Sequence, residues 1–277
     1  MFNIKGVDIS NNNSINNLST LVDNGVEYVY LKATEGATFK DRVSPNRYNQ
    51  CKSLGLKVGF YHFLVGTSTP EAQAENFYNY IKDYDCDLKP SLDVETNFSD
   101  LCNYVIRFID KWKELSNLEL CIYTYSSFIP YLQPIEGNIK DIPLWIANYT
   151  SDYSRVNTGF FSNVIGWQYS ENGVIGNFKG DCNVFNESCL ITPVGEWIKD
   201  DKGWWYKHSD GSYTKSDFEL IDGEWYYFDC NGYMITGWLY LTSTDCNYYF
   251  YSNGQMAHDC ELWGTWKFDC NGHGSKI

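Results

Sequence analysis

The stretch Lys89-Pro90-Ser91-Leu92-Asp93-Val94-Glu95-Thr96 carries two carboxylates, two residues apart, at the end of a short apolar run. Because side chains alternate along an extended strand, Asp93 and Glu95 point to the same side. At a rise of about 3.3 Å per residue, their Cβ atoms lie roughly 6–7 Å apart. Each acid then feels the charge of the other, so that one carboxyl can stay protonated while the other ionises.

Two interpretations of this pair are open. Cleavage of a bond between two sugars needs an acid that protonates the leaving oxygen and a carboxylate that supports the cationic centre or activates a nucleophile. Two solvated acids on a strand edge would give the same letters, and a motif this short does not separate the two interpretations. The remainder of the chain has to decide.

Composition narrows the class of protein. The chain has 277 residues, enough for one large and one small domain, and 43% of them are hydrophobic, enough for a sizeable core. A net charge of −14 argues against binding nucleic acid and favours a neutral or cationic ligand. The four histidines are scattered and no C-x-x-C occurs, so we expect neither a metal nor a cofactor.

Neither a membrane span nor an export signal is expected. No window of about 18 consecutive apolar residues exists. The first five residues, Met-Phe-Asn-Ile-Lys, lack the long apolar run of a signal peptide, so synthesis without Sec-type export is predicted.

Ten cysteines are present. Those at 51, 86, 102 and 121 fall in apolar segments and are interpreted as buried thiols. Pairing of Cys182 with Cys189, or among Cys230, Cys246, Cys260 and Cys270, stays open, since sequence alone does not decide it.

Up to about residue 190 the pattern is that of an α/β fold. Helical patterns at 14–24 (with Ser14 as cap), 46–54, 69–84 and 100–114 alternate with short apolar strands. This alternation predicts a parallel barrel or an open sheet, and the later strands follow one another with less helix, so an irregular closure is expected. The expected strands are 4–9, 28–32, 57–63, 91–94, 120–123, 144–147, 164–169 and 182–185.

Aromatic content divides the chain into two domains. The 84 residues from Val194 onward hold 7 of the 10 tryptophans and 9 of the 23 tyrosines. An apolar run ends at Pro193, so we place one domain at 1–191 and a second at 194–277.

Polar and aromatic side chains gather where the expected strands end. In a barrel, these positions form one rim. An acidic rim with aromatic walls suits a sugar, because aromatic faces stack on pyranose rings while polar groups pair with hydroxyls. A lone His62 is more simply a structural histidine. The candidate substrate contacts are Tyr61, Tyr123, Trp145, Tyr149, Trp167 and Gln168, beside Asp8, Asp93, Glu95 and Asp181.

Eight short segments carry a resemblance to a known family: Gly-Val-Asp-Ile-Ser at 6–10, Leu-Lys-Ala-Thr-Glu-Gly at 31–36, Gly-Phe-Tyr-His-Phe at 59–63, Leu-Asp-Val-Glu at 92–95, Ile-Tyr-Thr at 122–124, Leu-Trp-Ile-Ala-Asn-Tyr at 144–149, Gly-Trp-Gln-Tyr at 166–169 and Asp-Cys-Asn-Val-Phe at 181–185. In this order they resemble the glycoside hydrolase family 25 lysozymes. The resemblance implies an irregular (β/α) TIM-like barrel that cleaves the β-1,4 bond between N-acetylmuramic acid and N-acetylglucosamine in peptidoglycan. It also implies Glu95 as general acid, with Asp93 beside it and Asp8 and Asp181 in the same cluster.

Two routes through this site are open. Asp93 could attack the sugar directly, as in ordinary retaining enzymes. Alternatively, the 2-acetamido carbonyl of the substrate is the nucleophile and Asp93 orients it, which is the route that the family resemblance favours. Negative charge from the neighbouring acids should raise the pKa of Glu95, as a general acid requires.

The last third is periodic. Asp-Gly or Asn-Gly pairs recur at 210–211, 231–232, 253–254 and 271–272, each after an aromatic run. Asn-Gly between such runs is a hairpin signal, so we expect a small all-β module of about four stacked hairpins.

These units resemble choline-binding repeats, in which aromatic residues of adjacent hairpins cage a quaternary ammonium by cation–π attraction. A Phe stands at 218 where Trp is usual, and residues 256–260 lack the Gly-Trp step, so some cages are expected to be missing. The candidate choline contacts are Trp205, Phe218, Trp225, Trp238, Tyr248 and Trp266.

Together these features indicate a modular peptidoglycan hydrolase, held on choline-substituted teichoic acid by its repeats. Without an export signal, a phage or prophage endolysin is expected, cytoplasmic until the membrane is breached, as by a holin. A homodimer through the repeats is left open. Two alternatives remain: a non-catalytic wall adhesin, and a muramidase whose repeats bind glucan instead of choline.

Overall fold

The computed structural model describes residues 2–15, 17–191, 195–208, 211–221 and 224–277. The chain divides into two compact units, Met1–Thr192 and Pro193–Ile277. Their boundary falls within two residues of the division drawn from aromatic content. Each unit is described by itself.

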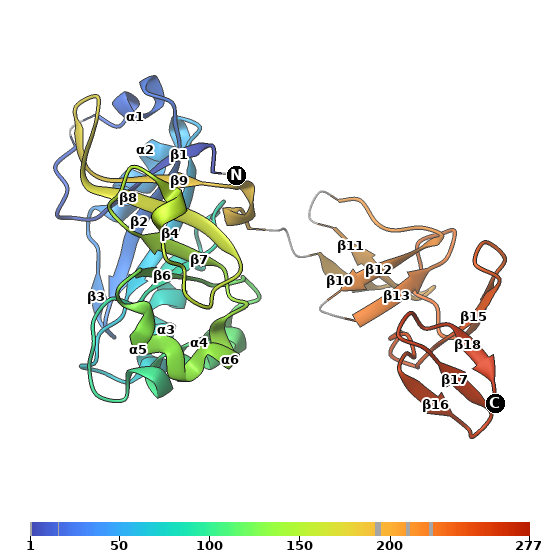
Figure 1. The fold of residues 1–277 in the computed structure, drawn as a ribbon. Coiled ribbons are helices and arrows are strands. Elements are labelled where there is room, and N and C mark those ends of the chain that lie inside the picture. Colours follow the sequence, from blue (N-terminus) through green and yellow to red (C-terminus); the bar gives the residue numbers. More distant parts are fainter. Residues whose placement is uncertain (1, 16, 192–194, 209–210, 222–223) are drawn as a thin grey trace. The chain divides into compact units, whose positions relative to one another are not determined.

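The first unit is built on one sheet that closes into a barrel (Figure 1). Strands run in the order β1-β9-β8-β7-β6-β5-β4-β2-β3, and pairing of β1 with β2 closes the ring. Neighbours are parallel except at β9, which is antiparallel to both β8 and β1, and at the short β3. The expected irregular barrel is confirmed. The strands are β1 Ile4–Ile9, β2 Val26–Glu35, β3 Phe39–Lys40, β4 Lys57–Phe63, β5 Ser91–Asp93, β6 Cys121–Tyr125, β7 Leu144–Ala147, β8 Val164–Ile175 and β9 Phe178–Phe185.

Helices cover the earlier part of the barrel. Thr69 caps α3 by accepting a hydrogen bond from the backbone N–H of Ala72, and Pro70 begins the helix, as its residue type favours. The later strands are joined by short helices only, which accounts for the irregular closure. The helices are α1 Ser19–Asp23, α2 Ser44–Ser53, α3 Pro70–Ile81, α4 Leu101–Leu115, α5 Ile129–Leu132 and α6 Glu136–Ile139.

Helix α1 is shorter than predicted, and Ser14 does not cap it. The preceding segment is rich in asparagine, whose side chain competes with helical hydrogen bonds. Asn13 Oδ1 accepts from the backbone N–H of Ser10, and Asn17 Oδ1 accepts from that of Ser19. These local turns delay the start of the helix.

Aromatic rings form one of the buried clusters of the barrel unit. Tyr30 stacks on Trp145 with centroids 4.7 Å apart, and Phe185 packs against both. A Cβ at Gly6 or Gly166 would overlap the ring of Phe185, so these strands need glycine where the ring lies.

His62 is structural, in line with its simpler interpretation. Its Nδ1 lies 2.7 Å from Thr34 Oγ1 and its Nε2 lies 3.1 Å from Gln73 Oε1. Burial lowers the pKa of His62 to about 3, so the ring is neutral at neutral pH.

The ten cysteines, all described, are free thiols. Cys182 and Cys189, one of the pairings left open by sequence, do not bridge: Cys182 Sγ donates to Gly180 O, and Cys189 Sγ lies 3.2 Å from the Tyr30 hydroxyl. Of the four thiols expected to be buried, Cys51 and Cys121 are buried and Cys86 and Cys102 are half-buried.

The second unit consists of small hairpins, as expected. Strand β18 joins the last two hairpins into a five-stranded sheet of order β14-β15-β18-β17-β16. The hairpins are β10 Glu196–Lys199 with β11 Trp204–Lys207, β12 Asp217–Ile221 with β13 Glu224–Phe228, β14 Gly237–Leu241 with β15 Cys246–Phe250, and β16 Cys260–Leu262 with β17 Trp266–Phe268, followed by β18 Gly274–Lys276.

Of the three Asn-Gly pairs, Asn271-Gly272 connects two strands that pair, β17 and β18, as predicted. For the other two, at 231–232 and 253–254, the prediction was wrong: they follow the second strand of a hairpin and turn the chain toward the next one. The N–H groups of Gly232, Gly254 and Gly272 donate to carbonyls three residues earlier. After the first two of these turns a single bridge forms, pairing Phe228 with Met234 and Phe250 with Met256. The remaining pair, the Asp-Gly at 210–211, lies partly outside the described residues.

Methionines link one repeat to the previous one. The N–H of Met234 donates to Trp204 O at 2.7 Å, and that of Met256 donates to Trp225 O at 2.8 Å. The same contact therefore recurs one repeat later. Since each hairpin is too small to bury its own face, these contacts between neighbours complete the core.

Candidate active site and repeat sites

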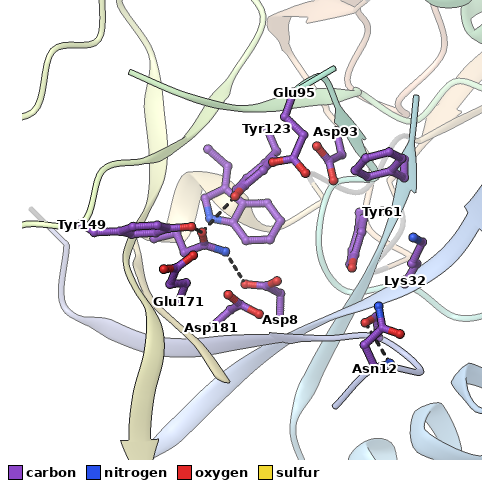
Figure 2. A pocket seen from close by; sticks show the side chains of 14 residues that line it. Asp8, Asn12, Lys32, Tyr61, Asp93, Glu95, Tyr123, Tyr149, Glu171 and Asp181 are labelled. Carbon is purple, nitrogen blue, oxygen red and sulfur yellow. Dashed lines mark hydrogen bonds between the residues drawn. The ribbon is translucent and has the colours of Figure 1, made fainter. Parts of the chain in front are cut away.

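Four acids far apart in sequence meet in one cavity of about 240 Å3 (Figure 2). Asp8 lies on β1, Asp93 ends β5, Glu95 follows it, and Asp181 lies on β9. Parallel strands bring the carboxyl ends of β1 and β5 to the same rim, and the antiparallel pairing of β9 with β1 places Asp181 opposite Asp8. Glu171 on β8 is a fifth acid in the lining, and sequence reasoning missed it.

A hydrogen-bond network holds Asp8. Asp8 Oδ2 accepts from Gln168 Nε2 at 2.9 Å and from Asn183 Nδ2 at 2.8 Å. The hydroxyls of Tyr123 and Tyr149 donate to Gln168 Oε1, at 2.9 and 3.1 Å, which turns the amide nitrogen of Gln168 toward Asp8. Burial raises the pKa of Asp8 to about 6, while these two amide donors act in the opposite direction.

Asn183 is a supporting residue that the sequence analysis did not single out. Its Oδ1 accepts from Trp145 Nε1 at 2.9 Å, which fixes its Nδ2 on Asp8. The available signal was its position on β9, two residues after Asp181 and therefore on the same side of the strand.

Asp93 and Glu95 both keep protons more readily than isolated acids. Asp93 is buried, and burial together with the charge of Glu95 raises its pKa well above the usual range. Its Oδ1 has no hydrogen-bond partner within the described part of the chain. Burial, with the charge of Asp8 as a second cause, raises the pKa of Glu95.

Asp181 completes the acidic cluster. Burial, followed by the charge of Asp8, raises its pKa to about 8. Lys32 lines the same cavity, and its positive charge acts to lower the pKa of Asp93 and that of Glu95. Its Nζ is also paired with Glu35 Oε2 at 2.6 Å. A group of carboxyls that shares protons near neutral pH is suited to general acid catalysis.

Five of the six predicted substrate contacts line this cavity: Tyr61, Tyr123, Trp145, Tyr149 and Gln168. Trp167 does not. It lines a separate cavity with Phe2 and Tyr153, and its Nε1 donates to Asn148 O at 2.8 Å. Side chains alternate along β8. Because Gln168 faces the acids, its neighbour Trp167 faces the opposite side of the strand. Lining residues that the sequence analysis did not list as contacts are Ser10, Asn12, Lys32, Phe63 and Glu171.

Within the described residues, no group of three His, Cys, Asp or Glu is arranged to hold a metal ion. In the same part of the chain, no helix is long and apolar enough to cross a membrane.

The repeat module contains a cavity of about 340 Å3 with aromatic walls. Trp197, Trp204 and Tyr226 line it with Met234, and the centroids of Trp197 and Tyr226 are 4.9 Å apart. Ser252 and Asn253 complete the lining. Three aromatic rings around one cavity form a cage of the kind that holds a quaternary ammonium.

None of the six predicted choline contacts belongs to this cage. Trp204, not its neighbour Trp205, lines it, and Trp205 packs on Tyr213 instead, with ring centroids 5.5 Å apart. Adjacent residues of a strand face opposite sides, and the sequence does not indicate which side faces the next hairpin.

The other predicted residues fall into two groups. Phe218 packs on the buried Tyr248 with ring centroids 5.0 Å apart, and the rings of Phe218 and Trp225 meet edge to face. Trp266 packs on the exposed Trp238, with centroids 4.6 Å apart. In the first group, Phe218, Trp225 and Tyr248 stand one repeat beyond Trp197, Trp204 and Tyr226, as strand register and the methionine contacts show.

In comparison with known proteins, a family model matches part of each unit. The model of the glycosyl hydrolases family 25 matches residues 7–178, so the chain belongs to this family. The choline-binding repeat model matches residues 214–260.

Known lysozymes are similar to this chain over part or all of its length. The autolytic lysozyme of Clostridium acetobutylicum is 33% identical over 193 residues, which are 68% of this chain and 57% of that protein. The lysozyme of Streptococcus phage Cp-1 is 28% identical over 78% of this chain and 65% of that one. The crystal structure of the modular Cpl-1 endolysin complexed with a peptidoglycan analogue matches with a TM-score of 0.53 and 26% identity, covering 99% of this chain and 82% of that one. The chain thus spans less than two thirds of these two curated lysozymes.

Proposed function

We propose that this chain is an N-acetylmuramidase that cleaves the β-1,4 bond between N-acetylmuramic acid and N-acetylglucosamine in peptidoglycan. The observation that carries the proposal is the convergence of Asp8, Asp93, Glu95 and Asp181 in one aromatic-walled cavity of a family 25 barrel.

In the proposed reaction, Glu95 gives its proton to the glycosidic oxygen as the bond to the anomeric carbon breaks. The substrate's own acetamido carbonyl attacks that carbon, and Asp93 accepts a hydrogen bond from the acetamido N–H. The buried Oδ1 of Asp93, which has no hydrogen-bond partner among the described residues, supports this role, since an oxygen left without a partner is costly until substrate arrives. Water then opens the ring intermediate, with Glu95 as base, and the configuration is retained.

Asp8 serves this reaction through its charge. Its negative charge favours the protonated form of Glu95 before the bond breaks and stabilises the positive charge that develops on the sugar. The network from Gln168 and Asn183 keeps Asp8 in place during the reaction.

The decisive experiment is mass analysis of peptidoglycan digested by the protein. New reducing ends on muramic acid are expected. Reducing ends on glucosamine would contradict the bond assignment, and intact glycan would favour the non-catalytic adhesin. Incubation in 18O-water with time-resolved analysis of anomers tests retention.

We also propose that the repeats hold the enzyme on choline-substituted teichoic acid. The cage of Trp197, Trp204 and Tyr226 supports this ligand. Tethering raises the effective concentration of the glycan substrate without adding catalytic contacts. Elution from a tertiary-amine column by choline is expected, and a glucan binder would ignore choline.

The biological setting is part of this proposal. We infer an endolysin that stays in the cytoplasm until the membrane is breached, on the strength of its similarity to the phage Cp-1 lysozyme. Fractionation of producing cells before and after lysis tests this location. A homodimer through the repeats is tested by sedimentation with and without choline.

A further inference from the structure

Four aromatic rings form a continuous surface on the last two hairpins, which we call the aromatic platform: Trp238, Tyr249, Trp263 and Trp266. Trp238 lies at its centre. The centroid of its ring is 5.3 Å from that of Tyr249, 5.8 Å from that of Trp263 and 4.6 Å from that of Trp266. Beneath these rings, Phe268 is buried, with its centroid 6.0 Å from that of Trp238. The platform thus rests on a packed core and has a fixed shape.

The aromatic platform is open to solvent. Trp263 is 58% exposed and Trp238 is 46% exposed, while Tyr249 and Trp266 are half-buried. Proteins seldom leave contiguous apolar side chains of this size exposed unless the surface binds something. The platform is therefore a candidate binding surface, and the question is which kind of ligand it fits.

Trp263 has a backbone conformation that its residue type disfavours. The turn from β16 to β17 has positive φ at both central residues, 56° at Trp263 and 62° at Gly264. The N–H of Thr265 donates to Leu262 O at 3.2 Å and closes this turn. Two-residue turns with two positive φ angles prefer Asn-Gly, because asparagine tolerates such a φ and a bulky side chain does not. Strain of this kind at an exposed tryptophan indicates that the ring itself has a function.

The platform is not a further choline cage. By strand register, the positions that correspond to the three rings of the cage are held in the last two hairpins by one tryptophan, one asparagine and one lysine: Trp238, Asn247 and Lys267. Asparagine supplies no aromatic wall, and the charge of a lysine would repel a quaternary ammonium. Another cation, Lys276 Nζ, lies 5.8 Å from the centroid of Trp266. These residues favour a neutral ligand over a cationic one.

We propose that the aromatic platform binds a neutral hexopyranose unit of a polysaccharide by stacking. The flat faces of Trp238 and Trp263 fit the C–H face of a pyranose ring and leave the hydroxyls of the sugar in water. This site is separate from the choline cage and takes a different class of ligand. It goes beyond the proposed choline tether, because it would give the repeats a second attachment to a wall that carries both ligands.

Affinity electrophoresis of the full chain in native gels tests the proposal. One gel contains dextran, a neutral polymer of glucose, and another contains glycol chitin, a neutral polymer of N-acetylglucosamine. Retardation by at least one polymer is expected, and the comparison distinguishes a plain hexose from an acetamido sugar. The retardation should persist in choline chloride at a concentration that elutes the protein from the amine column. No retardation by either polymer would overturn the proposal.

Trp263→Asn separates binding from folding. Asparagine suits the positive φ before Gly264, so the unfolding midpoint of the repeats should stay the same or rise while one ring of the platform is lost. We expect the affinity for the polymer to fall about 2- to 10-fold, the range of one aromatic contact. Trp204→Ala, in the choline cage, is the matched control: it should lose choline binding and keep the affinity for the polymer.

Two results with these variants would contradict the sugar site. Polymer affinity that is unchanged in Trp263→Asn would do so, because binding through the barrel or the cage would then explain the retardation. An equal loss in Trp263→Asn and Trp204→Ala would also do so. If Trp263→Asn changes only the sedimentation of the chain, the platform is a contact between copies and the proposal is wrong. Choline elution and the analysis of digested peptidoglycan test the proposed function separately, so either proposal can fail without the other.

Discussion

The two units of this chain build recognition sites in opposite ways. In the barrel, the polar groups that matter are buried and held by one another, as in the contact of Asp8 with Asn183, 175 residues away in sequence. In the repeats, the cage is made by neighbouring hairpins, and one of its walls, Trp204, is 41% exposed. A site assembled from the whole fold depends on global stability, whereas a site between neighbours depends on a few local contacts.

The largest difference between the units should come from Glu95→Gln. Loss of the proton donor is expected to lower turnover on peptidoglycan by about 10²–10⁴-fold or more, while choline elution stays unchanged. The measurement is clearing of purified walls beside elution from the amine column. Glu27→Gln, on an exposed position of β2, is the control. Wild-type clearing by Glu95→Gln would remove Glu95 from the mechanism.

The cores of the two units can be compared by truncating one buried phenylalanine in each. Phe185 and Phe250 are both fully buried, but Phe185 lies among the packed rings of the barrel and Phe250 in a small cluster between repeats. Phe185→Ala should destabilise the barrel by about 3–5 kcal/mol. Phe250→Ala should affect only the transition of the repeats. Calorimetry resolves this, and a loss of both transitions in either variant would show that the two units unfold together.

The acidic cluster should cost stability at neutral pH. The pKa of Asp181 is about 8 in the folded chain and near 3.8 when unfolded. Between these values the folded state binds more protons, so its stability falls as pH rises from about 4 to 8. Asp181→Asn removes this dependence and should stabilise the barrel by roughly 1–2 kcal/mol at pH 7, after allowance for solvent screening, and by nothing below pH 4.

Denaturant titrations at pH 4, 7 and 8.5 measure this gain. Asp83→Asn, at an exposed position, is the control and should change stability little at any of these pH values. A gain from Asp181→Asn that is the same at pH 4 and pH 7 would contradict the linkage.

The smallest effect is expected in the repeats. Trp204→Ala removes one wall of the cage and should weaken choline binding about 2- to 30-fold, the range of one cation–π contact. Hydrolysis of soluble glycan fragments should be unchanged. Trp263→Ala, a more exposed tryptophan that does not line the cage, is the control. Equal losses of choline binding in both variants would place the ligand elsewhere.

The sequence alone predicted much of the barrel. Apolar runs that end at Asp8 and Asp93, and the segment that begins after Asp181, marked strands by composition. The order of the matching segments resembled one family closely enough to imply a closed ring. Such features are local: a strand end and a period of two can be recognised without knowing which strand lies beside it.

Only the tertiary structure decided which face of each strand points inward. It turned Trp167 away from the acids and selected Trp204 over Trp205 for the cage. It also brought Asn183 and Glu171 to the site and placed two of the Asn-Gly turns, at 231–232 and 253–254, between hairpins instead of within them. Facing and neighbourhood depend on pairing between distant segments, and a one-residue change of register reverses them at almost no cost in local preference.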